Sequence, residues 1–550
     1  MNRQFKFLQM PSLIIMILVV CSVLTAHSQI QDVEIQIINP LKITLPSAER
    51  NFDKVPVKPL DPVYPPLIYG YRPLEYTAQP FRLQVRPLRL KEEPSETPRE
   101  GFVTIGYGNY GAPLADLFLP LHQNKKTGSS SALRAFHNSF AKGPVEGTRS
   151  ASGNTSVALD FRGAGKTVSS EGIASFRNVY SNFYGYPENT LLKNDSLGIS
   201  YSAAGMGIRM TDTRKSAFNY TLSGAFSHLW NNRKASETDL NVELGASAKA
   251  GKDGSVKFNF RYDLLAREDT GLEAKPRNLI SGGLSYGFKI NKNFQAEAGL
   301  STAGEDDQLL KKSLHLYPLL KWNILFAPGL NFDGYLRGGV EKVSLHSLSA
   351  ENIWMDKNVQ IGHTNNLIDF GTFLNAQFKG VWTAKAGFRY NDFSNMFFFV
   401  NQASDSSRFG LSYDDATRIN PDLSISFNKG SVSGGLKLDL FIWSVSRLAA
   451  PFHKPKGSAE WNLDVALSEK LFFRPYAIIY WGITAPVASD PARVNTLPVA
   501  NDIGFRMDFN FSERGSVTAR VNNLTGNSYS LFQNYPVRGF QAIAGLTWRF

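Results

Sequence analysis

The chain has 550 residues, of which 43% are hydrophobic, 12% aromatic and only 19% charged, and this balance excludes a disordered protein. Its single cysteine, Cys21, excludes a disulfide scaffold, a cysteine-rich zinc site and an iron–sulfur site. The net charge of +12 favours an anionic partner. Because the chain starts with an export signal, lipopolysaccharide or phosphorylated lipid head groups are better candidates for that partner than nucleic acid.

Residues 1–28 have the features of a secretory signal peptide. Two basic residues come first, an apolar run follows at 13–24, and Ala26 and Ser28 put small side chains at positions −3 and −1 of a cleavage site. The apolar run is too short for an anchor helix, which needs about 20 residues. The residue before Cys21 is not small, as a lipoprotein signal requires. We predict cleavage after Ser28, which leaves a mature chain without cysteine, as suits the oxidising bacterial envelope.

Residues 29–100 differ in composition from the rest of the chain. Twelve of the 28 prolines lie between Pro40 and Pro98. Proline at this density removes hydrogen-bond donors and blocks helices and central strands, so the segment is predicted to be extended. We interpret it as a periplasmic tether. The alternative is a binding strap for an acidic or periplasmic partner, because the segment also carries basic residues such as Arg82 and Arg86.

From Gly101 onward, apolar residues alternate with polar ones. In residues 503–511, one face carries an isoleucine, a methionine and three phenylalanines, and the other carries glycine, arginine, aspartate and asparagine. The same period of two recurs at 256–264, 382–390 and 436–442. This is the period of a β-strand and not of a helix, so the region is predicted to consist of strands.

Three features favour a transmembrane β-barrel over a soluble β-sandwich. The alternating segments are long, short polar turns alternate with longer connections, and the inward faces carry charges that a packed core does not tolerate. The longer connections include 142–153, 182–194, 342–364 and 484–499. The fold is therefore predicted to be all-β, an antiparallel barrel over 101–550 that follows the extended proline-rich segment.

We count about 22 strands, within a range of about 14 to 24, because element boundaries read from a sequence shift by a few residues. Both ends of the barrel then fall on the side of the short turns, as an even number of strands requires. The segments 396–400 and 408–413 are left over from this count, and we assign them to a hairpin in an outer loop.

The last predicted strand, 537–550, carries a candidate signal for membrane insertion. Leu546, Trp548 and Phe550 lie on one face of this strand, and Phe550 is its final residue. An alternating strand that ends in phenylalanine resembles the signal by which the barrel-assembly machinery recognises bacterial outer-membrane proteins. We therefore expect the chain in the outer membrane, in contact with lipid and lipopolysaccharide.

Two segments resemble a known family. The run Val521–Phe550 is similar to the last two strands of TonB-dependent receptors, and the segment 106–113, GYGNYGAP, resembles Bacteroidota barrels labelled TonB-dependent receptor-like. The residues that fit the receptor pattern are Val521, Asn523, Leu524, Tyr529, Tyr535, Pro536 and Gly539. The resemblance extends over 101–550 and implies a barrel with a role in transport.

The chain departs from this family in front of the barrel. A TonB-dependent receptor has a globular plug and a TonB box, whereas residues 29–100 are too few and too rich in proline to form a plug. We therefore expect a plug-less barrel that acts as a passive or gated channel or transport protein. The alternative is a non-transporting structural or assembly subunit of an outer-membrane complex. A periplasmic or surface lipoprotein partner fits both.

The sequence shows no local pattern of a metal, cofactor or catalytic site. None of the seven histidines after residue 28 forms an HxH, HxxxH or HExxH motif. His137-Asn138-Ser139 suggests a hydrolase only weakly, because no partner acid is marked. Gly163–Thr167 ends like a phosphate loop but lacks the leading glycine and a following helix. We predict neither an enzyme nor a bound cofactor.

Overall fold

The computed structural model describes residues 101–550, apart from 125–126, 146–148, 187–196, 215, 272–273, 308–313 and 488–489. The predicted signal peptide and proline-rich segment lie outside the described residues. Within the described part of the chain, no helix is long and apolar enough to cross a membrane.

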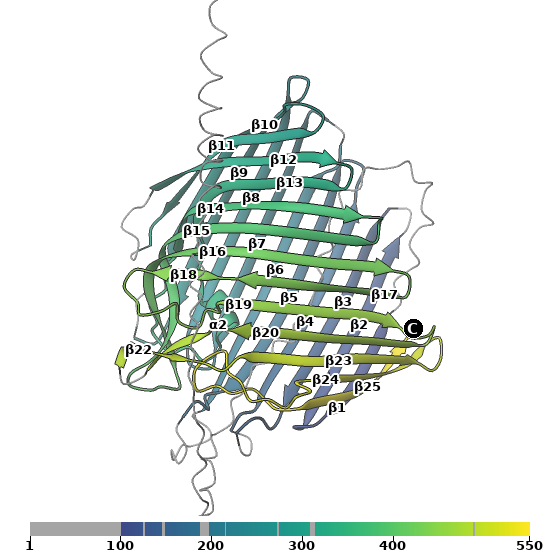
Figure 1. Ribbon diagram of the computed structural model, residues 1–550, viewed down its shortest axis with the longest axis vertical. Helices are drawn as coiled ribbons and strands as arrows, with labels where there is room; N and C mark the ends of the chain where they lie inside the picture. The colour runs from purple at the N-terminus through teal and green to yellow at the C-terminus, as the bar shows by residue number, and fades with distance from the viewer. Residues whose placement is uncertain are drawn as a thin grey trace, which may run out of the picture. The chain divides into compact units, whose positions relative to one another are not determined.

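Almost all of the described secondary structure is β-strand (Figure 1). The elements in chain order are β1 (Phe102–Gly108), β2 (Ala112–Asn124), β3 (Ser129–Phe140), β4 (Ser152–Ala164), β5 (Val168–Asn182), β6 (Gly198–Asp212), β7 (Phe218–Asn231), β8 (Ser236–Ala250), β9 (Gly254–Glu268), β10 (Arg277–Lys289), β11 (Phe294–Glu305), β12 (Leu314–Ala327), β13 (Leu330–Glu341), α2 (Leu345–Glu351), β14 (Thr364–Phe378), β15 (Trp382–Asn401), β16 (Phe409–Lys429), β17 (Val432–Leu440), β18 (Ile442–Val445), β19 (Gly457–Ala466), β20 (Leu471–Trp481), β21 (Thr484–Val487), β22 (Asp490–Thr496), β23 (Ala500–Asn510), β24 (Gly515–Asn522) and β25 (Gln541–Arg549).

The strands close into one antiparallel barrel. Each wall strand pairs with the next one along the chain, and β1 pairs with β25, so the sheet has no free edge. β17 and β18 both pair with β16 and share one place in the wall, while β21 and β22 form a separate two-stranded sheet. The wall therefore has 22 strand positions, which confirms the predicted count of about 22.

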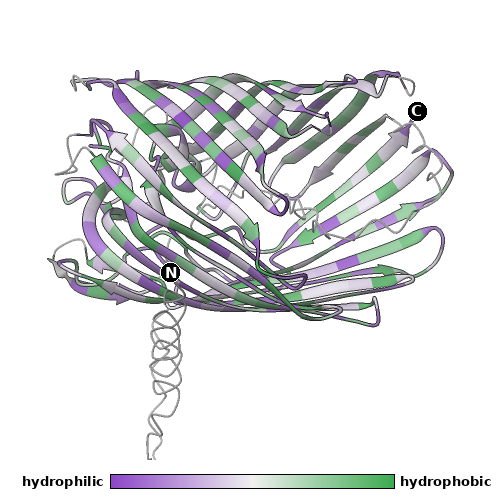
Figure 2. Cartoon of the chain, turned by 90° about the horizontal axis from the view of Figure 1, so that it is seen from above, coloured by the Kyte–Doolittle hydropathy of each residue, from purple (hydrophilic) through white to green (hydrophobic). Residues whose placement is uncertain are grey.

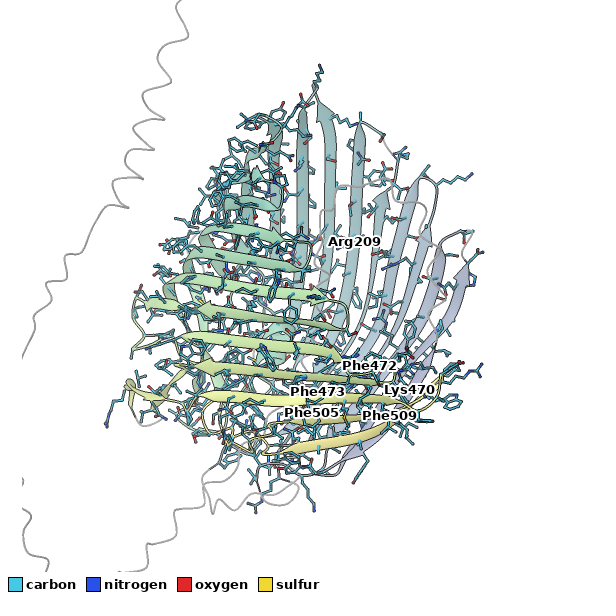
Figure 3. All side chains as sticks on the ribbon, turned by 45° about the vertical axis from the view of Figure 1, so that its right-hand side comes forward. Arg209, Lys470, Phe472, Phe473, Phe505 and Phe509 are labelled. Carbon is cyan, nitrogen blue, oxygen red and sulfur yellow. The ribbon has the colours of Figure 1, made fainter. Side chains whose placement is uncertain are left out.

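The outer face of the wall is apolar. Ile105 on β1 and Leu546 on β25 are register partners whose side chains are 67% and 61% exposed, as expected for groups that contact lipid. On β20, Phe473 lies on this face against Phe505, whereas its neighbour Phe472 lies on the lumenal face near Arg474 (Figure 3). Colouring by hydropathy shows the same alternation along the strands (Figure 2). The apolar belt and the closed wall make this chain an outer-membrane β-barrel.

The lumenal face is polar and its charges are mostly paired. Because water reaches the lumen, each such pair contributes only about 0–1 kcal/mol, and the pairs make the lumen hydrophilic rather than rigid. Ion pairs on this face are Arg134–Asp160, Arg162–Glu171, Arg261–Glu243, Lys321–Glu297, Arg337–Asp369, Arg389–Asp422 and Arg474–Asp508.

The two ends of the barrel differ. The ends of β1 and β25 lie together at the end of the short turns, where the backbone of Gly101 and Phe550 exchanges two hydrogen bonds of 3.0 and 2.9 Å. The longer connections gather at the opposite end, on the left of Figure 1. The parity expected from the sequence is therefore correct, and by this polarity the long connections face the cell exterior.

The segments left over from the strand count are extensions of two wall strands. β15 and β16 run through them, and residues 396–401 pair with 409–414 beyond a bulge at Phe393 and Met396. They do form a hairpin at the outer end, as predicted, and the number of wall positions is unchanged.

Candidate functional site

Four connections fold together at the outer end of the barrel and form a compact cap. We use "the cap" for residues 342–363, 396–414, 446–456 and 523–540. The cap contributes to the largest buried apolar cluster among the described residues. Its fully or almost fully buried members include Phe183, Tyr184, Leu345, Leu348, Ile353, Trp354, Met355, Phe399, Phe409 and Tyr535. The cap is therefore held by its own core and not only by the strands beneath it.

A stacked pair of aromatic rings lies at the centre of this core. The ring centroids of Trp354 and Tyr535 are 3.9 Å apart with an interplanar angle of 22°, and Tyr184 packs edge-on against both. The indole Nε1 of Trp354 donates to the carbonyl oxygen of Asn182 at 3.1 Å, and the hydroxyl of Tyr535 donates to the carbonyl of Ser407. Each aromatic pair adds about 0.5–1.5 kcal/mol of stability beyond the burial of its rings. Because the rings come from connections that are distant in sequence, these contacts hold three connections together.

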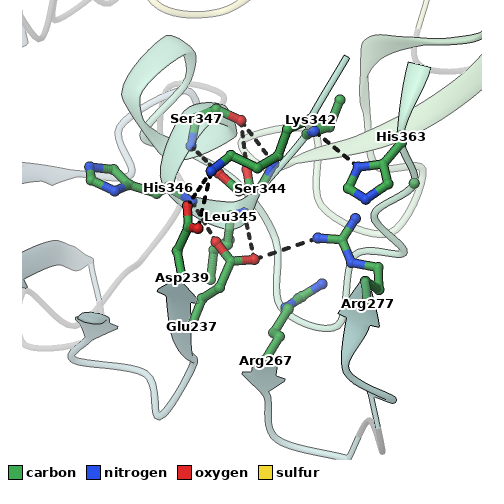
Figure 4. Close-up of polar contacts among 12 residues, drawn as sticks. Glu237, Asp239, Arg267, Arg277, Lys342, Ser344, Leu345, His346, Ser347 and His363 are labelled. Carbon is green, nitrogen blue, oxygen red and sulfur yellow. Dashed lines mark hydrogen bonds and ion pairs between the residues drawn. The ribbon is translucent and has the colours of Figure 1, made fainter. Parts of the chain in front are cut away.

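Helix α2 is tied to the barrel wall by a buried carboxylate (Figure 4). Glu237 on β8 accepts hydrogen bonds from the backbone N–H groups of Leu345 and His346, at 3.0 and 3.1 Å. Ser344 caps the same helix by accepting from the backbone of Ser347 at 3.0 Å. Arg277 lies 3.6 Å from the Glu237 carboxylate and balances its charge. The first turn of α2 thus has its backbone donors satisfied by the wall and by its own cap residue.

A lysine forms the second tie between the 342–363 connection and the wall. The Nζ of Lys342 lies 2.7 Å from Asp239 on β8 and 3.0 Å from Asp263 on β9. The Asp263 side chain is fully buried, so this carboxylate depends on its cationic neighbours for compensation. Removal of the lysine would leave that buried charge less compensated.

His363 closes the same connection at its other end. Its Nδ1 accepts a hydrogen bond from the backbone of Val343 at 3.2 Å, and its own backbone N–H donates to Asp307. Burial, reinforced by the nearby Arg277, lowers the pKa of His363 to about 4. The ring is therefore neutral at neutral pH and fastens the two ends of residues 343–363 to each other as an uncharged acceptor.

His453 plays a similar part in the 446–456 connection. Its Nδ1 lies 2.9 Å from the carbonyl oxygen of Phe399, and its Nε2 accepts from the backbone of Gln533 at 3.3 Å. Burial lowers the pKa of His453 to about 4. A neutral imidazole with one donor and one acceptor nitrogen satisfies both partners, and protonation would remove the acceptor.

Arg538 joins the 523–540 connection to the connection between β3 and β4. Its guanidinium is fully buried, donates to Ser150 and Ser152 at 3.3 and 2.8 Å, and lies 4.0 Å from the ring centroid of Phe140. Burial lowers the pKa of Arg538 to about 10, so the group stays charged at neutral pH. The charge is spread over carbonyl oxygens and an aromatic face instead of a carboxylate.

A cavity of about 470 Å³ lies between the cap and the upper lumen, and we call it the cap cavity. Its lining is mainly apolar and aromatic, with a few polar groups. Aromatic side chains of the lining are Phe140, Tyr201, Trp354, Tyr480, Tyr529, Phe532 and Tyr535, and polar ones include Asn154, Arg177, His346, Glu351 and Asp502. The cavity is partly open, and a largely apolar hollow with a few polar groups is the usual form of a small-molecule site.

A second hollow, of about 530 Å³, follows the lumenal wall nearer the short turns. Ion-paired side chains line it, among them Arg134 with Asp160 and Arg162 with Glu171. Arg209, which is labelled in Figure 3, lies in the same lining. The charges here are half exposed, so this surface suits a hydrated path better than a tight site.

The residues predicted for membrane insertion lie where a factor in the membrane could reach them. Leu546, Trp548 and Phe550 point outward from the end of β25 and are 61%, 50% and 52% exposed. Their role in insertion stays a prediction, and Ser28 lies outside the described residues.

Sequence reasoning missed the cap and its cavity. The one available signal is Tyr535-Pro536, which belongs to the receptor pattern and lies at the centre of the cap. Of the motifs set aside, residues 163–167 comprise the end of β4 and the turn 165–167 to β5, with the N–H of Gly165 bonded to the carbonyl of Val168 at 3.0 Å. His137 and Ser139 are in contact, with Nε2 and Oγ 3.1 Å apart. Within the described residues, no group of three or more histidine, cysteine or acidic side chains is arranged to hold a metal ion.

No family model matches the chain, and no curated protein matches it. The similarity lies in the fold. The FrpB iron transporter from Neisseria meningitidis (F3-3 variant) superposes with a TM-score of 0.63 at 9% identity, covering 83% of this chain and 82% of that one. The siderophore receptor PirA from Acinetobacter baumannii gives 0.61 at 11% identity, over 82% and 80%. The ferric-catecholate import receptor Fiu from Escherichia coli K12 gives 0.59 at 8% identity, over 82% of each chain. The predicted resemblance to receptor barrels is confirmed at the level of the fold.

Proposed function

We propose that this chain is a gated outer-membrane transport barrel that binds a compact ligand in the cap cavity. The observation that carries the proposal is the cavity itself, about 470 Å³ in volume, bordered by loop residues above and by lumenal strand residues below. A ligand in this space contacts both the cap and the channel wall. Opening of the cap would then connect the exterior, the bound ligand and the polar lumen.

A gated barrel fits the cap better than a permanently open pore. Trp354, Tyr535 and their neighbours bury an apolar core across the outer end, and exposing such a core to water costs free energy. The closed state is therefore stable without a ligand. The charged lumen below suits the passage of a hydrated solute, and we propose that residues 29–100 act as a periplasmic tether rather than as a plug.

The ligand class is suggested by the similar folds. The related barrels are named for siderophores, iron and ferric catecholates. The aromatic lining can stack planar rings, and Arg177 offers one cation to an anionic group of a ligand, beside the carboxyl groups of Glu351 and Asp502. Ferric siderophores are therefore the first ligands to test, by quenching of Trp354 fluorescence in the purified barrel. A Trp354→Phe variant should lose the ligand-dependent part of the signal.

Single-channel conductance in planar bilayers tests the gate. We expect the mature protein to be closed most of the time and Trp354→Ala to open more often, because that substitution removes the centre of the cap core. Trp461→Ala is the matched control, since Trp461 is 41% exposed on the outer face of β19 and lies outside the cap. A variant that lacks residues 29–100 distinguishes an effect of this segment on conductance from an effect of the cap.

The outcomes are distinct. More frequent opening of Trp354→Ala but not of Trp461→Ala supports a cap gate. If conductance appears only when residues 29–100 are removed, this segment is a plug and the cap is not the gate. If all four proteins are silent, the transport proposal fails, and stable co-purifying partners would then favour a structural or assembly subunit.

A further inference from the structure

Three polar side chains form a hydrogen-bonded row on the barrel wall, at the outer ends of β3 and β4. The Nε2 of His137 lies 3.1 Å from the Oγ of Ser139, two residues along the same strand. The Nδ1 of His137 lies 2.8 Å from the Oγ1 of Thr155, its register partner on β4. All three side chains are partly exposed.

This row faces the lipid and not the lumen. Register partners point to the same side of a sheet, and His137 is in register with Ala115, which is in register with Ile105. Ile105 is 67% exposed on the outer face. Val157, two residues from Thr155 on the same face of β4, is 39% exposed and continues the apolar belt towards the short turns.

The row therefore lies at the outer edge of the apolar belt. Beyond it the strands end, and the connection 141–151 begins. At this depth the hydrocarbon gives way to the head groups of the outer leaflet. The acyl esters of membrane lipids lie at the same boundary, so a lipid ester can reach Ser139 from the bilayer.

The geometry is that of an activated nucleophile. A serine hydroxyl contacts one nitrogen of a histidine, and a third group holds the other nitrogen. In the tautomer this requires, Nδ1–H of His137 donates to Thr155 and Nε2 accepts from Ser139. A threonine orients the ring but does not stabilise its positive charge. In a serine protease, replacing the carboxylate by an amide slows turnover by about 10⁴, so slow hydrolysis is expected here.

We propose that Ser139, His137 and Thr155 form a hydrolase site for acyl esters of outer-leaflet lipids. The Oγ of Ser139 attacks the ester carbonyl while Nε2 of His137 takes its proton. The ester C–O bond then breaks, the leaving alcohol takes that proton, and an acyl group remains on Ser139. Water, deprotonated by His137, attacks the acyl-serine, and the products are a fatty acid and the regenerated hydroxyl.

The neighbouring strand gives this site a wall. Gly153 is the register partner of Ser139, and a Cβ at that position would lie 2.4 Å from Cε1 of Tyr180 and 3.0 Å from Cβ of Ser139. The absence of a side chain on Gly153 therefore lets the ring of Tyr180 lie beside Ser139. The ring offers an apolar surface for an acyl chain beside the serine.

A second histidine–threonine pair on the wall provides a natural control. The Nδ1 of His228 lies 2.9 Å from the Oγ1 of Thr238, also between register partners on adjacent strands. Two residues from His228 stands Trp230, whose ring stacks on the imidazole at 5.7 Å, in place of a serine. This pair has the histidine and its orienting hydroxyl but no nucleophile.

The test uses the mature barrel in vesicles of phosphatidylethanolamine, and in parallel with lipopolysaccharide. A fluorophosphonate probe should label Ser139, located by peptide mass spectrometry, and Ser139→Ala should abolish the label and the release of fatty acid. His137→Ala should reduce both by at least about a hundredfold, since general-base catalysis contributes that much. His228→Ala should change neither. All variants should keep the heat-resistant gel mobility of a closed barrel.

Fatty acid from only one of the two lipids identifies the source of the ester and supports the proposal. Absence of label on Ser139, label that survives His137→Ala, or label without fatty acid from either lipid overturns it. In those cases the row is a structural hydrogen-bond network at the membrane interface.

Discussion

Acid should loosen the cap, because two buried neutral histidines hold it together. His363 fastens the ends of the 342–363 connection, and His453 bridges the hairpin of β15 and β16 to the 523–540 connection. Burial is the main cause of the low pKa of both rings. Asp306 and Asp307 favour protonation of His363 and Arg277 opposes it, while Lys454 opposes protonation of His453.

The size of the effect follows from linkage. Each histidine has a pKa of about 4 in the closed cap. In an opened, hydrated cap the value returns to about 6.5. A histidine whose pKa is lowered in the closed cap stabilises that state fully at a pH above its pKa in the opened cap. This stabilisation is lost as the pH falls towards the pKa in the closed cap. At about pH 4.5 the loss is about 2.5 kcal/mol per histidine, or about 70-fold in the opening equilibrium.

Hydrogen exchange of cap peptides measures the opening equilibrium of the cap between about pH 7.5 and pH 4.5, once the rates are normalised to intrinsic exchange rates. Cap amides should lose protection at low pH, while the amides of β5 to β10 should keep theirs. The control is the double variant His363→Asn with His453→Gln. Its amide oxygens take the place of the histidine nitrogens that accept hydrogen bonds, and amides do not titrate. Its protection should be nearly independent of pH. Equal acid sensitivity in this variant and the native protein would refute the role given to the histidines.

Three further predictions concern the rest of the chain. Phe550→Ala combined with Trp548→Ala should lower the amount of folded barrel in outer-membrane fractions several-fold, measured by heat-modifiable gel mobility, with unchanged stability of the protein that does insert. Mass spectrometry of the mature N-terminus should find cleavage after Ser28, and any other start contradicts that assignment. Arg538→Met should lower the free energy of unfolding by about 3 kcal/mol in urea, because buried acceptors, the carbonyl of Ser150 among them, lose their donor. An unchanged urea midpoint would show that water replaces the guanidinium.

The wall of the barrel could be predicted from the sequence because the membrane imposes a simple rule on it. A residue such as Phe505 must face lipid and its neighbour Arg506 must face water, so the period of two is written directly in the chain. Only local information is needed, and the strand spans follow to within a few residues. The extension of β15 and β16 was harder to place because Met396–Val400 lies above the membrane, where lipid no longer sets the pattern.

The cap could not be predicted by the same reasoning. Trp354 and Tyr535 stack on each other although one lies between β13 and β14 and the other between β24 and β25. Contacts of this kind depend on loop paths that no periodicity records. The row of His137, Ser139 and Thr155 shows an intermediate case. The first two residues could be read from the sequence, but the third and the face of the wall on which all three lie required the register of β3 with β4.

The pairing of β1 with β25 has a consequence for how the molecule is made. These strands are the first and last of the wall to be synthesised, and their contact joins the most distant parts of the described chain. Every other wall pairing links near neighbours and can form while later strands are still being exported. The pairing of β1 with β25 cannot form so early. The barrel therefore remains an open sheet with two free edges until its final strand arrives. Those edges are open to pairing with other strands throughout that interval, because unpaired strand edges associate with one another.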